Sequence, residues 1–140
     1  MSRNTFATID TPALSRNLER VRTIVGGARI MAVIKADAYG HGLGQCVPAL
    51  AKADLLAVAT LDEASAVRAI DARAAILLLE GITSRGELDE VRRLDLELVF
   101  HHSAQLDWGR RDHRLRCAVS RRPRHAHRRR RNRLRRRLSA

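Results

Sequence analysis

Four short apolar runs recur along the chain at nearly regular intervals. They occupy residues 30–34, 55–59, 76–79 and 96–100, and their starts lie 25, 21 and 20 residues apart. The first three are almost continuously apolar, which is typical of parallel strands covered by helices on both faces, whereas Glu97 interrupts the fourth. The spacing between the runs leaves room for a crossover helix in each connection.

The segment before the first run carries the signals of an amphipathic helix. Pro12 suits a first helical turn, and the apolar residues that follow it recur at helical spacing. Asp10 or Thr11 is expected to cap this helix, and Gly26 with Gly27 is expected to end it.

Further helices are predicted between the runs. Residues 60–63 and 84–87 both read as capping boxes, with a hydroxyl side chain followed three positions later by Glu. Pro48 is tolerated only in a first turn, so the helix between the first two runs should be short, about residues 46–53. Alternating strands and helices specify an α/β fold with right-handed crossovers. Periodicity does not choose between an open doubly wound sheet and part of a (β/α)8 barrel.

Lys35 follows the first apolar run directly. A lysine at the carboxyl end of a buried parallel strand faces the edge where (β/α) folds place their sites, and desolvation there favours the neutral, nucleophilic amine. The alternative is a strand-end lysine that reaches into solvent. Gly40 and Gly42 bracket His41 in a turn where backbone amides could approach an anion, and Tyr39 adds a hydroxyl donor near the same edge.

The positive charge of the chain is concentrated in its last segment. Residues 1–108 hold 12 basic and 14 acidic side chains, whereas residues 109–140 hold 15 Arg, no Lys and one acidic side chain. This tail lacks apolar periodicity, so we expect it to be disordered. Two interpretations stay open: an Arg-rich segment that binds nucleic acid without sequence preference, or out-of-frame translation of a GC-rich coding sequence.

Other classes of protein are disfavoured. The longest apolar run, residues 74–79, is far shorter than the roughly 18 residues that span a bilayer. No basic segment followed by an apolar one marks a secretory signal, so a cytoplasmic chain is the default expectation. The cysteines and histidines match no standard zinc spacing, and we expect no metal.

The string AVIKADAYGHG at residues 32–42 resembles the pyridoxal-phosphate lysine signature of the alanine racemases. The resemblance extends over roughly residues 4–108. It implies the N-terminal part of a (β/α)8 TIM-type barrel, about four βα units, in residues 1–108, with residues 109–140 as a separate tail. It further implies that Lys35 forms the internal aldimine with pyridoxal 5'-phosphate and that Tyr39 contacts the cofactor phosphate.

The resemblance also implies a reaction and what this chain lacks for it. Family members are homodimers that interconvert L- and D-alanine and so supply D-alanine for the cell wall. A tyrosine of the second domain, supplied across the dimer interface, is their second catalytic base. Tyr39 is the one tyrosine in this sequence, so we expect a catalytically incomplete chain, truncated or frameshifted near residue 108.

Overall fold

Five parallel strands form one sheet, and neighbours in the sheet are neighbours along the chain. The computed structural model describes residues 6–110 and 115–117. The strands are β1 (Met31–Val33), β2 (Leu55–Val58), β3 (Ile76–Leu78), β4 (Leu96–Leu98) and β5 (Arg116–Cys117). The first four lie inside the four apolar runs, as predicted. Their sequential order is that of a barrel wall, because a doubly wound sheet reverses its strand order part-way.

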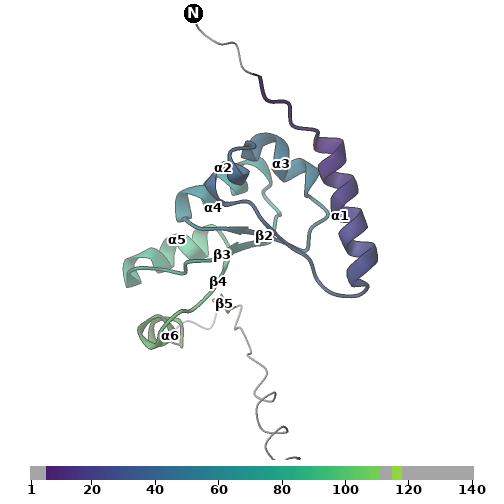
Figure 1. The fold of residues 1–140 in the computed structure, drawn as a ribbon. Coiled ribbons are helices and arrows are strands. Elements are labelled where there is room, and N and C mark those ends of the chain that lie inside the picture. Colours follow the sequence, from purple (N-terminus) through teal and green to yellow (C-terminus); the bar gives the residue numbers. More distant parts are fainter. Residues whose placement is uncertain (1–5, 111–114, 118–140) are drawn as a thin grey trace, which may run out of the picture.

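Helices occupy the connections between the strands, as Figure 1 shows. They are α1 (Thr11–Val25), α2 (Lys35–Tyr39), α3 (Leu43–Ala49), α4 (Leu61–Ile70), the 3-10 turn η1 (Arg85–Glu87), α5 (Leu88–Arg93) and α6 (Ser103–Arg110). This alternation confirms the predicted α/β fold.

Two of the predicted helix starts are confirmed. Asp10 caps α1, accepting a hydrogen bond of 2.8 Å from the amide of Ala13, and Gly26 ends the helix at a positive φ of 63°. At α4 the capping box is complete, since Thr60 Oγ1 accepts from the Glu63 amide while the Glu63 carboxylate accepts from the Thr60 amide. Both helices therefore begin where the side-chain chemistry of the sequence places them.

The capping box predicted at residues 84–87 is wrong in its first half. The Ser84 hydroxyl makes no capping hydrogen bond. The Glu87 amide bonds instead to the backbone oxygen of Ser84 at 3.3 Å, which closes the tighter 3-10 turn η1 before α5 begins. The Glu87 carboxylate turns back to the amide of Thr83 at 2.9 Å and to its hydroxyl at 2.5 Å.

The helix predicted at residues 46–53 lies earlier, as α3 at Leu43–Ala49, so Pro48 is near its end rather than in its first turn. The cause is a cap that local patterns do not reveal. The side chain of Asp37, six residues upstream, accepts a 2.7 Å hydrogen bond from the Leu43 amide and starts the helix there.

Ordered elements continue past residue 108, where the tail was expected to begin. Helix α6 ends at Arg110, and β5 pairs with β4 through Glu97 and Arg116. A strand of two residues is too short to show an apolar pattern that would predict it from the sequence. The rest of the expected tail lies outside the described residues.

Within residues 6–110 and 115–117, helices pack on one face of the sheet and not on the other, which corrects the expectation of helices on both faces. On the covered face, strand residues such as Val58, Leu78 and Leu98 join the helices in one large apolar cluster. On the other face, Leu55, Ala57 and Leu77 form a small cluster made of strands alone. The alternate strand residues therefore divide into two layers, as in the wall of a barrel.

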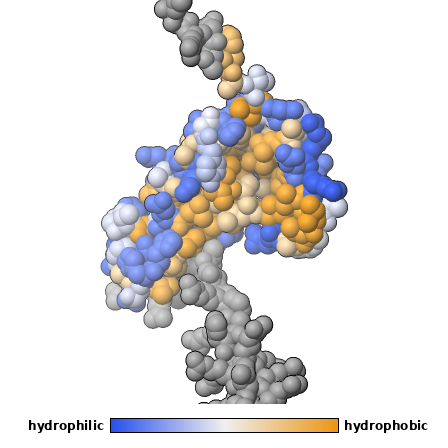
Figure 2. Space-filling view, in the orientation of Figure 1, coloured by the Kyte–Doolittle hydropathy of each residue, from blue (hydrophilic) through white to orange (hydrophobic). Residues whose placement is uncertain are grey.

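The face without helices is apolar and partly open at the β1 margin. Met31 and Val33 of β1 are 43% and 36% exposed. Figure 2 shows hydrophobic surface across the middle of the view, where Figure 1 places the strands. In an eight-stranded barrel this layer would be the interior.

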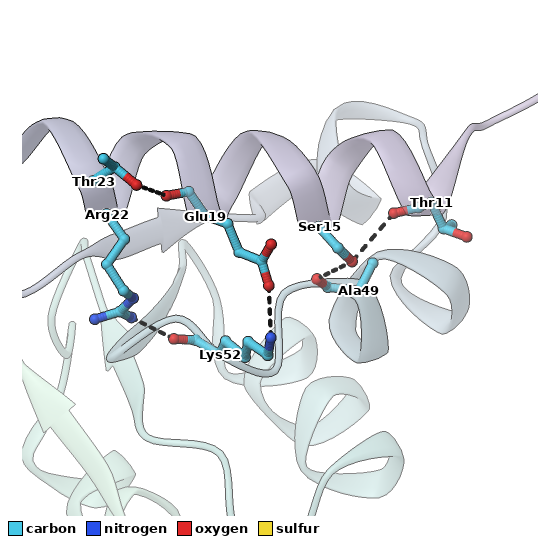
Figure 3. Close-up of polar contacts among 7 residues, drawn as sticks. All are labelled: Thr11, Ser15, Glu19, Arg22, Thr23, Ala49 and Lys52. Atoms are coloured by element: carbon cyan, nitrogen blue, oxygen red, sulfur yellow. Dashed lines mark hydrogen bonds and ion pairs between the residues drawn. The ribbon is translucent and has the colours of Figure 1, made fainter.

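Polar contacts fasten α1 along the end of α3 (Figure 3). The Ser15 hydroxyl donates to the backbone oxygen of Ala49 at 2.8 Å. One turn further, Lys52 Nζ lies 2.6 Å from a carboxylate oxygen of Glu19, and Arg22 donates to the backbone oxygen of Lys52. These contacts set the position of α1 relative to the segment that leads into β2.

Asp54 connects these contacts of α1 to the start of β1. Its carboxylate accepts a 2.7 Å hydrogen bond from the Ile30 amide and lies 3.2 Å from a guanidinium nitrogen of Arg22. The Ile30 amide, aided by the positive charge of Arg22, holds the pKa of Asp54 below its ordinary value. The ionised carboxylate therefore stabilises the folded chain.

We predict that Asp54→Ala lowers the urea midpoint of unfolding at pH 7. The loss should shrink as the pH falls below about 3.9, the ordinary aspartate value, and through the lower pKa of Asp54, because the parent chain then loses the same charge. Circular dichroism of urea unfolding at a series of pH values measures this. The exposed Asp107 is the control, and Asp107→Ala should leave the midpoint unchanged; an Asp54 effect independent of pH would contradict the assignment.

Candidate functional site

Lys35 lies at the carboxyl edge of the sheet, as predicted. The last bond between β1 and β2 at this edge runs from the Ile34 amide to Ala57 O at 2.8 Å, and Lys35 is the next residue and the first of α2. Its side chain is half-buried, and within the described residues no hydrogen bond or ion pair engages its amine. Lys35 therefore lies at the edge where barrel enzymes hold their sites.

The four residues after Lys35 form a left-handed turn. The φ angles of Ala36, Asp37, Ala38 and Tyr39 lie between 52° and 56°. Each L-residue in this conformation costs roughly 1–2 kcal/mol relative to the right-handed helix. Four in succession are a concentrated strain, of the kind found at functional sites. The sequence predicted a turn at residues 40–42 but gave no sign of the left-handed residues before it.

Hydrogen bonds within the segment hold the left-handed turn. The Ala38 amide donates to Ile34 O, and the Gly40 amide donates to Ala36 O, each at 2.9 Å. The Gly42 amide returns to Asp37 O at 2.9 Å, where Gly42 has a φ of 89° that favours glycine. These bonds close the segment on itself.

The same bonds correct the expectation that amides of this turn receive an anion. The amides of residues 40–42 donate to backbone oxygens of the left-handed turn, and the Leu43 amide donates to the side chain of Asp37. They are committed inside the loop, because the strained turn needs them as donors. Any anion bound here would have to find other donors.

Tyr39 and His41 line a hollow on the α1 side of the loop. This cavity has a volume of about 440 Å³ and also borders Leu14 of α1 and Cys46 of α3. Tyr39 is 59% exposed, whereas His41 is tied to the loop by its Nδ1, 2.8 Å from Ala38 O. Burial raises the pKa of the Cys46 thiol, which keeps it protonated and unreactive. Lys35 does not line this cavity, so the structure places the two predicted site residues at opposite ends of one turn.

A second, smaller hollow lies at the ends of β2 and β3. Its volume is about 250 Å³, and its walls include Thr60, Glu80 and Glu87. It shares the carboxyl edge of the sheet with Lys35, which is the edge that a barrel site would use.

Glu63 contacts the Lys35 segment in a way the sequence analysis missed. Its Oε1 accepts a 2.7 Å hydrogen bond from the amide of Ala36, the residue after Lys35. The capping box marked Glu63 as a helix residue, but a link across 27 positions of sequence has no local signal.

The fold and the site define a class: a wall of parallel βα units with a lysine at its carboxyl edge. The family model described as "Alanine racemase, N-terminal domain" matches residues 9–120, and the chain belongs to this family. The match runs past residue 108, where the resemblance was expected to stop.

Individual relatives agree with the family match. The alanine racemase of Polaromonas naphthalenivorans is 47% identical over 107 residues, which are 76% of this chain and 29% of the relative. The structure of alanine racemase from Acinetobacter baumannii matches with a TM-score of 0.70 and 35% identity over 74% of this chain and 31% of that one. That from Bartonella henselae, with covalently bound pyridoxal phosphate, matches with a TM-score of 0.66 and 27% identity over 73% and 30%. The chain thus spans about 29% of the length of the curated relatives it matches.

These findings also bear on the alternatives left open by the sequence. Neither the family match nor the relatives support a nucleic-acid-binding protein. Among the described residues, none of the helices has the length and apolar character needed to cross a bilayer.

We predict that Ala36→Gly stabilises the chain by about 0.5–1 kcal/mol. Glycine removes a left-handed strain of roughly 1–2 kcal/mol and adds about 0.5–1 kcal/mol of unfolded-state entropy. The matched control is Ala66, an exposed alanine inside α4. Ala66→Gly should destabilise by about 1 kcal/mol, because its helix is right-handed. Urea denaturation of both variants decides, and equal losses would show that residue 36 is not left-handed.

Proposed function

We propose that this chain is the cofactor-holding part of an alanine racemase and that Lys35 binds pyridoxal 5'-phosphate covalently. The single observation that carries the proposal is a half-buried lysine with a free amine at the carboxyl edge of a parallel sheet, in a chain of this family. In this reaction Lys35 Nζ would attack the aldehyde carbon of the cofactor, and water would leave.

The chain offers one competing amine of the same kind, and its surroundings argue against it. The sequence holds two lysines, Lys35 and Lys52. Lys52 lies between α3 and β2, at the amino edge of the sheet, and its Nζ is 2.6 Å from Glu19. This amine is therefore engaged in an ion pair on an exposed side chain. Lys35 has no such partner among the described residues, so its amine need not leave an ion pair to reach an aldehyde.

The proposed substrate is alanine, and the proposed setting is a cytoplasmic homodimer. The bound cofactor supplies an electron sink that makes the α-proton of an amino acid removable. Lys35, once free of its covalent link, would take that proton on one face. Tyr39, with its exposed hydroxyl, would donate to the phosphate group in place of the committed loop amides.

Racemisation needs a second proton donor on the opposite face of the substrate. Tyr39 is the sequence's one tyrosine; it lies at the other end of the turn that begins at Lys35, and we assign it the phosphate contact rather than this proton. We therefore propose that the described residues hold the cofactor and supply one of the two proton donors.

We predict that incubation with pyridoxal 5'-phosphate followed by borohydride reduction places a pyridoxyl group on Lys35. Peptide mass spectrometry identifies the labelled residue. The label should disappear in Lys35→Ala and persist in Lys52→Arg, which removes the other lysine amine and keeps the charge opposite Glu19. A label on Lys52 alone, or on neither lysine, would contradict the proposal that Lys35 binds the cofactor.

A further inference from the structure

Glu63 gathers backbone amides from two separate segments of the chain. Its Oε2 accepts from the amides of Ala59 and Thr60 at 2.8 and 3.3 Å, where β2 gives way to α4. Its Oε1 accepts from the Ala36 amide at 2.7 Å. One carboxylate therefore joins the start of α4 to the left-handed turn, and charge-assisted bonds of this kind are about twice as strong as neutral ones.

The Ala36 amide is the nitrogen of the peptide group that Lys35 shares with Ala36. The hydrogen bonds between β1 and β2 end at the Ile34 amide, two residues before Ala36, so the sheet does not hold this peptide. Ala36 is also the first residue of the left-handed turn. Fixing the orientation of this peptide plane fixes the direction in which the Lys35 side chain leaves the backbone.

The link is particular to the Lys35 unit. Glu87 holds the corresponding place in the next unit, at the start of the helical segment that follows β3. Its carboxylate contacts Thr83 of its own loop, at the amide and the hydroxyl. A glutamate in the first turn of a helical segment at this edge therefore does not always contact the loop of the preceding unit. Glu87 is accordingly a matched control for Glu63.

We propose that Glu63 is a positioning residue, which aims Lys35 at the cofactor by clamping the Lys35–Ala36 peptide across the sheet edge. The inference rests on the proposed role of Lys35 and extends it to a residue of the next βα unit. Glu63 acts through the backbone and touches neither the cofactor nor the substrate.

The test compares Glu63→Gln with Glu87→Gln in the full chain. Glutamine keeps the length of the side chain but has one acceptor oxygen in place of two, so it cannot serve both amide groups. Hydrogen exchange of the Ala36 amide, followed by NMR without cofactor, should become about tenfold faster or more in Glu63→Gln. Borohydride-trapped labelling of Lys35 by pyridoxal 5'-phosphate should slow by about the same factor. Glu87→Gln should change neither rate more than about twofold.

The outcomes separate this inference from the proposed function. If Glu63→Gln shows the parent's rates of Ala36 amide exchange and Lys35 labelling, the positioning role of Glu63 is overturned, whereas the proposed role of Lys35 stands. Slow labelling shared equally by Glu87→Gln would also overturn it, because general loosening would then be the cause. A parent chain whose Lys35 is never labelled overturns both proposals. If Glu63→Gln fails to fold, Glu63→Asp carries the same two measurements, since its carboxylate is one methylene too short to reach Ala36.

Discussion

The hydrogen bonds between parallel strands all end at the carboxyl edge of the sheet. Backbone amides just beyond that edge must therefore find other acceptors. The structure meets this constraint with carboxylates. Glu63 serves the loop after β2, Glu87 serves the loop after β3, and Asp37 starts α3. The same chemistry that completes the loops also determines where helices begin and how the lysine segment is held.

The strain of the left-handed turn is compatible with a folded chain because of these bonds. The turn is bounded by Ile34, which is buried and still paired with β2, and by Gly42, which donates back to Asp37. The strained residues are therefore fixed at both ends, and Glu63 fixes them from the side. The Lys35 side chain leaves this constrained backbone in few directions, which would favour capture of the proposed cofactor in one orientation.

Much of the fold could be predicted from the sequence, because the strands and α1 are set by apolar patterns and by local caps such as Asp10 and Thr60. What could not be predicted depends on contacts between distant residues. The amide at the start of α3 bonds to the side chain of Asp37, and the Ala36 amide bonds to Glu63 in the next unit. The place of Lys35 followed from its strand, but its proposed chemical role came from a resemblance, since position alone favoured a lysine that reaches into solvent.

The sequential order of the strands bears on how such a chain forms during synthesis. Each strand pairs with the one made just before it, as Leu55 does with Met31 and Ile76 with Leu56. Each of these partners lies about 20 to 24 residues earlier in the chain, so structure can accumulate as the ribosome releases each unit. The most recently formed strand is then the edge to which the next strand pairs. The loop after β1 gains its hydrogen bond from Ala36 to Glu63 as soon as the first turn of α4 has emerged.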